Sequence, residues 1–369
     1  MPRDLHSDYK EPSLSGRYIT LNQLKDNWLK PLSTYSNIVG KSVLEKDIIA
    51  LTMGTGPNKV LMWSQMHGNE STTTKAVVDL TNFLLSNSEE AKAILDSCTL
   101  KIVPILNPDG AEAYTRMNAN NIDLNRDAKT RNQPESRVLR GLFDSFQPKF
   151  CFNLHDQRTL FSAGPYPKSA TVSFLSPASD AERTITSSRE EAMKLIVAMN
   201  QVLQTLIPNQ VGRYDDSFNE NCVGDAFQME DVPTILFEAG HYKNDYHREQ
   251  TRKYIFYALW EAIRIISANS STLFNVSEYF NIPENEKLFF DILVHNAHLV
   301  NTKLEKGSSM GIRYTESLDG DFIDFIPKIQ GRGDLSGFFG HKVYDCSHEN
   351  DMRSILAEKK ILKVLNSSE

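Results

Sequence analysis

Two side chains that commonly bind metal ions stand close together near the start of the chain. His67 and Glu70 belong to Met66-His67-Gly68-Asn69-Glu70, which follows the apolar run 60–63 and precedes a helical pattern over 71–85. At the end of a strand, an imidazole and a carboxylate with this spacing can both point at one cation. Short matches of this kind are common, so a turn histidine beside a helix-start carboxylate explains the pair equally well on its own.

Two further ionisable residues stand at the ends of apolar runs later in the chain. His155 follows Phe150–Leu154, and Glu238 closes Thr234–Phe237. A hydrolytic zinc site needs nitrogen and carboxylate ligands and one open position for water, and His155 would complete such a set. Glu238 would take the proton from the activated water and pass it on. The alternatives are a buried histidine bonded to backbone and an ion-paired carboxylate at a strand end.

A third group combines arginines with an acidic residue. Arg116 lies ten residues before Arg126, which ends the motif Asp123-Leu124-Asn125-Arg126. Guanidinium groups bind carboxylates through two hydrogen bonds and stabilise developing oxyanions, and Asn125 could complete such a clamp. Asp123 could orient a metal-binding histidine by accepting a hydrogen bond from it. The alternative is a surface loop of mixed charge.

The elements that would position these residues alternate between strands and helices. Strands are predicted over 43–53, 59–65, 99–106, 150–154 and 234–237, and helices over 69–86, 135–146, 181–206 and 248–268. This pattern predicts a mixed, mostly parallel sheet that is covered on both faces. Ligands of such sheets bind beyond the carboxyl ends of the strands. The polar residues at those ends are His67, Asn107, His155 and Glu238.

The character of the chain changes after residue 269. Short strands are predicted over 287–294, 310–314, 321–326 and 341–344, with glycine-containing turns between them. We therefore expect a catalytic domain over residues 1–268 and a small β-rich domain over residues 280–369.

The amino-acid composition argues against some classes of binding partner. The net charge of −7 argues against nucleic acid and anionic membranes, which bind basic surfaces. Charges near the N-terminus and the lack of a long apolar run predict a cytoplasmic protein without a membrane-spanning segment. The oligomeric state is left open.

Six motifs occur in the order found in the M14 metallopeptidase family. They are His67-Gly68-Asn69-Glu70, Asn107-Pro108-Asp109-Gly110, Arg116, Asp123-Leu124-Asn125-Arg126, Asn153-Leu154-His155 and Phe237-Glu238. The chain thus resembles a zinc carboxypeptidase of this family over roughly residues 40–265. The resemblance implies an α/β fold with a central eight-stranded mixed sheet. It also implies one zinc ion, held by His67, Glu70 and His155, with Glu238 as the general base.

The same resemblance implies roles around a peptide substrate. Arg116 would polarise the scissile carbonyl, and Asn125 and Arg126 would hold the terminal carboxylate. Tyr214 is the candidate for the active-site tyrosine, with a packed aromatic residue as the alternative. Asn69 stands where digestive relatives often have an arginine, so one substrate contact differs.

Two other functions remain open at this point. The same motifs, the short interval between Glu70 and His155 and the C-terminal β domain also resemble the aspartoacylase and succinylglutamate desuccinylase branch. Those enzymes share the metal and the base but cleave small N-acyl amino acids, whereas Asn107-Pro108-Asp109-Gly110 favours a peptidase. An inactive binding module is the third reading, and the complete set of ligands, base and arginines argues against it.

Overall fold

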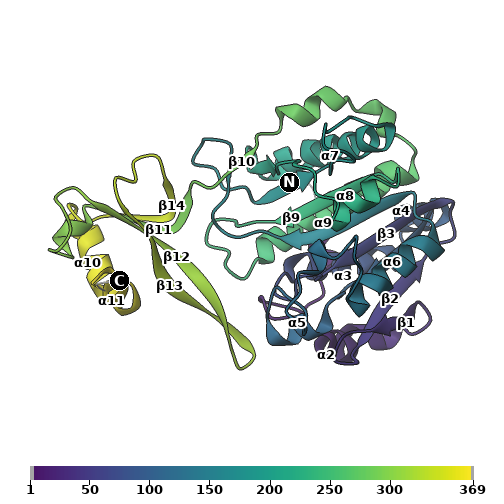
Figure 1. The fold of residues 1–369 in the computed structure, drawn as a ribbon, viewed down its shortest axis with the longest axis horizontal. Helices are drawn as coiled ribbons and strands as arrows, with labels where there is room; N and C mark the ends of the chain where they lie inside the picture. The colour runs from purple at the N-terminus through teal and green to yellow at the C-terminus, as the bar shows by residue number, and fades with distance from the viewer. Residues whose placement is uncertain (1–3, 367–369) are drawn as a thin grey trace.

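A mixed eight-stranded sheet forms the centre of the computed structural model, which describes residues 4–366 (Figure 1). The strand order is β1-β2-β4-β3-β5-β9-β7-β8. The strands are β1 (Ser36–Lys41), β2 (Asp47–Met53), β3 (Asn58–Ser64), β4 (Cys98–Val103), β5 (Phe150–Asp156), β7 (Val172–Leu175), β8 (Val211–Arg213) and β9 (Thr234–Ala239). The central strands β4, β3, β5 and β9 are parallel, so their carboxyl ends meet at one edge.

Helices cover both faces of this sheet. One core contains residues of α3 (Thr72–Leu84), α4 (Glu89–Ser97), α7 (Ser187–Leu206) and α9 (Glu249–Ser267). The opposite core contains residues of α6 (Pro134–Phe146) and α8 (Val223–Gln228). Near the N-terminus, α1 (Leu5–Tyr9) and α2 (Leu21–Leu24) precede a π-helical turn (Lys25–Leu29) and a 3-10 turn (Lys30–Leu32).

The apolar run of β3 shows why the sheet needs two helical layers. Val60 and Met62 belong to one core, whereas Leu61 and Trp63 belong to the other. Alternate residues of a strand point to opposite faces, so a strand covered on both faces is apolar throughout. The predicted α/β fold is thereby confirmed.

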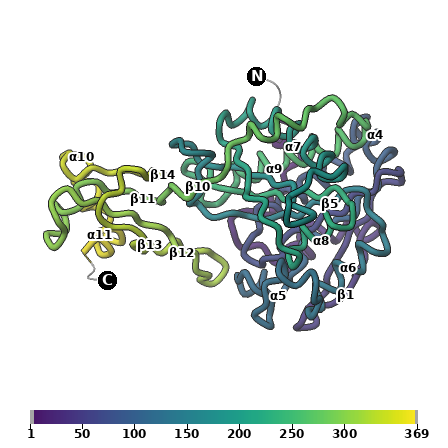
Figure 2. The backbone as a smooth tube through the Cα atoms, turned by 45° about the horizontal axis from the view of Figure 1, so that its top comes forward, coloured from purple at the N-terminus to yellow at the C-terminus, as the bar shows by residue number. Residues whose placement is uncertain are grey.

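A second sheet follows the large one, in the strand order β13-β12-β11-β14. Its strands are β11 (Phe289–His295), β12 (Ser309–Asp319), β13 (Phe322–Gly333) and β14 (Phe339–Asp345). The predicted C-terminal β domain is therefore present. Its β12–β13 hairpin extends from the small sheet toward the larger domain (Figure 2). The link to the large domain includes two 3-10 helices (Ser271–Leu273 and Val276–Asn281) and β10 (Asn285–Glu286), which pairs with β6 (Ser162–Ala163).

Several predicted elements differ in extent from the observed ones. The strand predicted over 43–53 begins only at Asp47, because a turn separates it from the unpredicted β1. The helix predicted over 181–206 begins at Ser187, where the Thr186 side chain accepts a hydrogen bond from the Arg189 N–H. The small domain also contains two unpredicted helices, α10 (Glu349–Ala357) and α11 (Lys359–Leu365). Among the helices of residues 4–366, none has the length and apolar character needed to cross a bilayer.

Candidate metal centre

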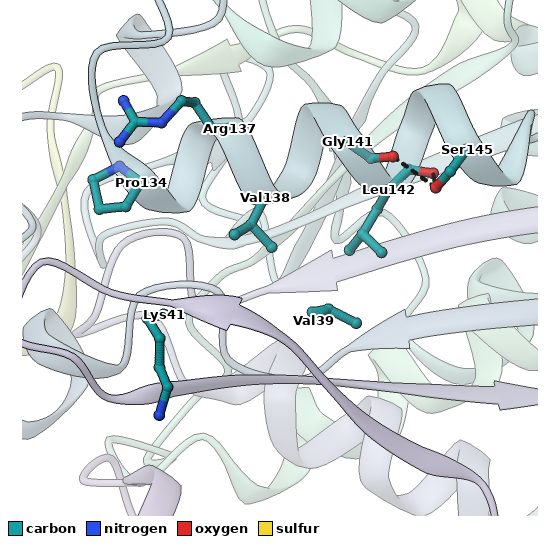
Figure 3. A pocket seen from close by; sticks show the side chains of 8 residues that line it. All are labelled: Val39, Lys41, Pro134, Arg137, Val138, Gly141, Leu142 and Ser145. Atoms are coloured by element: carbon teal, nitrogen blue, oxygen red, sulfur yellow. Dashed lines mark hydrogen bonds between the residues drawn. The ribbon is translucent and has the colours of Figure 1, made fainter.

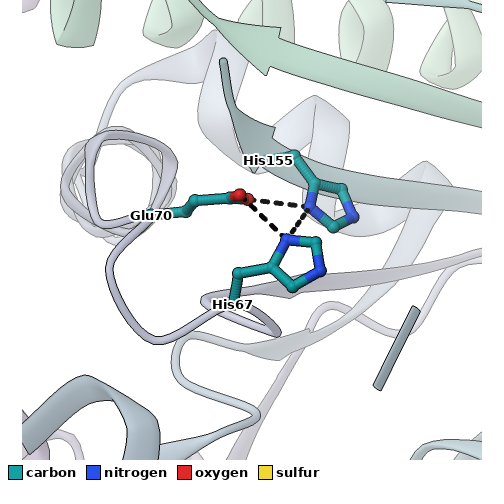
Figure 4. Close-up of side chains that lie close together, drawn as sticks. All are labelled: His67, Glu70 and His155. Carbon is teal, nitrogen blue, oxygen red and sulfur yellow. Dashed lines mark hydrogen bonds and ion pairs between the residues drawn. The ribbon is translucent and has the colours of Figure 1, made fainter. Parts of the chain in front are cut away.

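Three ionisable side chains meet at the carboxyl edge of the large sheet (Figure 4). Glu70 Oε1 lies 2.9 Å from His67 Nδ1, and Glu70 Oε2 lies 2.8 Å from His155 Nδ1. The two Nδ1 atoms are 3.1 Å apart. Both histidines are almost fully buried, at 1% and 2% exposure. The sequence-predicted ligands are therefore brought together, with two imidazoles and a carboxylate converging on one point.

Backbone packing explains the glycine between the first two of these residues. A Cβ atom on Gly68 would lie 1.9 Å from the carbonyl carbon of Gly110 in α5 (Pro108–Ala113). Asn107 accepts a hydrogen bond from the Gly110 N–H and donates to the carbonyls of Met66 and Met117. Asn107, predicted only as a strand-end polar residue, thus joins the loop before His67 to the segment that contains Arg116.

His155, the third residue of the group, lies in β5. Its neighbour Asp156 donates its N–H to Glu70 Oε2 at 3.2 Å. The Asp156 carboxylate accepts hydrogen bonds from the N–H groups of Thr72 and Thr73 at the start of α3. A carboxylate is favourable at this position because a helix N-terminus has free N–H groups and a partial positive charge. Asp156 therefore holds the helix that follows Glu70 against the strand that contains His155.

Asp123 contacts the first histidine of the group. Its Oδ1 lies 2.9 Å from His67 Nε2 and also accepts a hydrogen bond from the Asn125 N–H. Its Oδ2 accepts two hydrogen bonds from Arg116, and Arg116 Nη1 lies 3.1 Å from Glu70 Oε1. With Nε2–H donated to Asp123, the Nδ1 atom of His67 presents its lone pair to the group.

The electrostatics of the group favour a cation. Burial raises the pKa of Glu70, but the two histidines outweigh it and hold this pKa well below its usual range. Burial lowers the pKa of His67, yet Glu70 and Asp123 outweigh this effect and raise it. For His155, burial prevails and lowers the pKa.

These donors fit a zinc ion. The candidate ligand atoms all lie within 4.8 Å of one another. Lone pairs on two imidazole nitrogens and a carboxylate repel at these distances unless a cation or protons lie among them. Two nitrogen ligands and one carboxylate also match the ligand preference of catalytic zinc, which keeps a position open for water.

Glu238 lies beside this group. It is the register partner of His155 in the parallel pair β5–β9. Its Oε2 is buried and has no hydrogen-bond partner among the described residues. Burial, with Glu70 and Asp156 nearby, raises the pKa of Glu238 well above its usual range. An unpaired carboxyl group at this position is suited to accept a proton and return it.

The remaining predicted site residues are Asn125, Arg126 and Tyr214. Asn125 Oδ1 accepts a hydrogen bond from the Val223 N–H, which fixes the amide against α8. The exposed Arg126 uses Nη1 to reach its neighbour's carbonyl and the sulfur of Cys222. Tyr214 lies within electrostatic range of the site, since burial and then the charges of Glu238 and Glu70 raise its pKa.

A surface hollow elsewhere contains none of these residues. It lies between the edge strand β1 and α6, and Val39, Val138 and Leu142 form its apolar part (Figure 3). Arg137 and Lys41 line its rim. The hollow is on the α6 side of the sheet edge, and the metal-binding candidates lie at the strand ends.

Comparisons with known proteins agree with this geometry. Residues 26–220 match the model of the zinc carboxypeptidase family, peptidase family M14. A probable carboxypeptidase 2 from Arthroderma benhamiae is 30% identical over 109 residues, which cover 29% of this chain and 20% of the relative. Carboxypeptidase M from Mus musculus is 30% identical over 112 residues, covering 25% of each chain. These matches span only about a fifth to a quarter of the relatives' length.

Solved structures show the same fold. A metallo-carboxypeptidase from Burkholderia cenocepacia superposes with a TM-score of 0.55 at 18% identity, covering 68% of this chain and 70% of that one. Carboxypeptidase A from Helicoverpa armigera gives a TM-score of 0.52 at 17% identity, with coverage of 73% and 79%. The family match covers more than half of the 369 residues. The chain therefore belongs to the zinc carboxypeptidase family, peptidase family M14.

Proposed function

We propose that this protein is a zinc-dependent carboxypeptidase that hydrolyses the C-terminal amide bond of peptides. The observation that supports it most is the convergence of two imidazole nitrogens and the Glu70 carboxylate beside the unpaired carboxyl of Glu238. One zinc ion would be held by His67, Glu70 and His155. When bound, zinc lowers the pKa of a water molecule and polarises the scissile carbonyl.

The residues of the chain would share the remaining steps. Glu238 accepts the proton of the attacking water and returns it to the leaving amine. Arg116, which donates two hydrogen bonds to Asp123, stabilises the developing oxyanion. Asn125 and Arg126 bind the terminal carboxylate of the substrate, and Tyr214 is a further candidate for substrate binding. The expected partner is a peptide, with cytoplasmic location and no nucleic-acid or membrane partner as predictions from composition.

The domain division is part of the proposal. The expected boundary lies between residues 268 and 280. Tyr279 and Ile282 are buried in the core of the large domain, so we propose a boundary nearer to residue 283, before β10.

The test is Glu238→Gln assayed on peptides with free C-termini, with products identified by mass spectrometry. The variant should bind zinc as wild type does and lose about 10²–10⁴-fold in kcat, the usual contribution of general acid–base catalysis. Glu230→Gln, an exposed glutamate after α8, serves as the matched control. Full activity of Glu238→Gln would refute the mechanism. Hydrolysis of N-acyl amino acids in preference to peptides would favour the acylase alternative.

A further inference from the structure

One carboxylate of the small domain reaches the large domain close to the metal-binding candidates. Glu316 lies in β12, in the hairpin that extends from the second sheet (Figure 1). Its Oε1 is 3.0 Å from Arg17 Nη1, and its Oε2 accepts a hydrogen bond from the Tyr114 hydroxyl at 2.5 Å. Glu316 therefore joins two segments of the large domain that are distant in sequence.

The Arg17 side of this contact leads to the zinc ligands. The Arg17 carbonyl accepts a hydrogen bond from Ser71, the residue after Glu70. The Arg17 guanidinium is buried, and its Nη2 lies 3.9 Å from Asp156 Oδ2. Asp156 in turn holds the start of α3 and donates its N–H to Glu70, as described above.

The Tyr114 side leads to the catalytic arginine. Tyr114 ends α5 in the left-handed conformation, with φ of 53°. It lies two residues before Arg116, whose guanidinium contacts Glu70 and Asp123. Fixing the Tyr114 hydroxyl restrains the turn from which Arg116 projects.

Glu316 belongs to a group of buried and half-buried charges beside the metal-binding candidates. Two buried arginines, Arg17 and Arg248, face Asp156 and Glu316 in one electrostatic cluster. Without the Glu316 charge, Arg17 would lose the carboxylate that lies 3.0 Å away, and Asp156, 3.9 Å from its Nη2, would be the next carboxylate beside it. A buried guanidinium that has lost one carboxylate attracts the next carboxylate strongly. Asp156 would then be drawn toward Arg17 and away from the α3 N-terminus.

Other contacts dock the hairpin independently of Glu316. The Tyr246 ring lies 5.3 Å from the rings of Tyr314 and Phe325, and its hydroxyl donates to Asp291 at 2.9 Å. His341 contacts the Thr159 carbonyl at 2.7 Å. A change at Glu316 can therefore alter the charge cluster while the two domains stay together.

We infer that Glu316 is a positioning residue for the metal centre, and that the small domain completes the site through it. Glu316 holds Arg17 beside Asp156 and Tyr114 beside Arg116, so the ligand loop and the catalytic arginine keep their places. This inference rests on the proposed function for its effect on catalysis. Its effect on metal binding can be measured without any substrate.

The experiment uses full-length protein loaded with Co²⁺, whose visible absorption reports the geometry of its ligands. Glu316→Gln should lower Co²⁺ affinity about tenfold, at the lower end of the effect of residues that support metal ligands, and change the spectrum. Glu316→Asp, which restores the charge, should return part of that affinity. Thr315→Ala, at the exposed neighbouring position, should match wild type.

Phe325→Ala tests positioning against docking, because it loosens the hairpin contact with Tyr246 but removes neither polar partner of the Glu316 carboxylate, although Phe325 is the cross-strand partner of Glu316. We expect it to lower the midpoint of thermal unfolding and to leave the Co²⁺ spectrum close to that of wild type. A wild-type spectrum and affinity in Glu316→Gln would overturn the inference, as would equal effects of Glu316→Gln and Phe325→Ala. If the wild-type protein cleaves no peptide but the Co²⁺ spectrum of Glu316→Gln still differs from that of wild type, the proposed function fails and the positioning role stands.

Discussion

Asp123→Asn is the most informative single change near the metal-binding candidates. The carboxylate uses one oxygen for His67 Nε2 and the Asn125 N–H, and the other for two bonds from Arg116. An asparagine has only one acceptor oxygen, so its NH₂ group must face one of these sets of donors. If the oxygen stays with His67, Arg116 loses both bonds and gains a repulsive contact.

The magnitude follows from these contacts. Loss of the carboxylate charge behind a metal-binding histidine typically lowers metal affinity 10- to 100-fold, or about 1.4–2.7 kcal/mol. A displaced Arg116 would cost a further factor of about 10²–10³ in kcat, as for loss of an oxyanion-stabilising donor. The loss in kcat at saturating zinc should therefore be about 10²–10³-fold, and it should exceed the loss in metal affinity.

The assay is zinc affinity by chelator competition, followed by peptide hydrolysis at saturating zinc. Asp127→Asn is the matched control, because Asp127 lies in the same loop and its carboxylate bonds only to the N–H groups of Asn132 and Gln133 among the described contacts. We expect the control to lower thermal stability without changing zinc affinity. Wild-type zinc affinity and kcat in Asp123→Asn would show that neither His67 nor Arg116 depends on this carboxylate.

Two further predictions concern substrate binding and acid stability. Arg126→Ala should raise KM about 10- to 100-fold for peptides with a free carboxylate, because a hydrogen bond to a charged group is worth about 1.5–3 kcal/mol; unchanged KM and kcat would refute the clamp. Burial raises the pKa of Glu249, but Lys75 with Lys10 and Arg252 lowers it to about 2. Since the folded pKa lies below the unfolded value of 4.5, this stabilisation is present above about pH 4.5 and is lost as the pH falls toward 2. Glu249→Gln should therefore be less stable at pH 7 and flatten the acid limb of unfolding free energy; an unchanged limb would contradict the ion pair.

The fold and the metal-binding candidates could be predicted because both depend on local pattern. Strands buried on both faces appear as apolar runs, and parallel strands bring their carboxyl ends to one edge. His155 and Glu238 end neighbouring strands and are register partners, so their proximity follows once the strands are identified. The edge strand β1 and the short strand β8 lack such runs and were missed for that reason.

The missed helices α10 and α11 have a different explanation. They bury only one narrow stripe each, including Ile355, Ile361 and Leu365, against the second sheet. A short helix with so few buried residues is stabilised mainly by tertiary packing, which the local sequence does not reveal. The same limit applies to Asp156, whose role as a cap for α3 depends on a contact across many residues.

The contact between Arg17 and Glu316 shows where pattern-based reasoning stops. Each residue alone is an ordinary charged side chain, one between α1 and α2 of the large domain and the other in a strand of the small one. Their pairing exists only because the hairpin docks beside α5, which brings Glu316 within 3.0 Å of the buried Arg17 guanidinium. A polar residue that supports a site from another domain has no fixed spacing from the residues that it supports. Such residues can be found only from the assembled structure, by following each buried charge near the site to its partner.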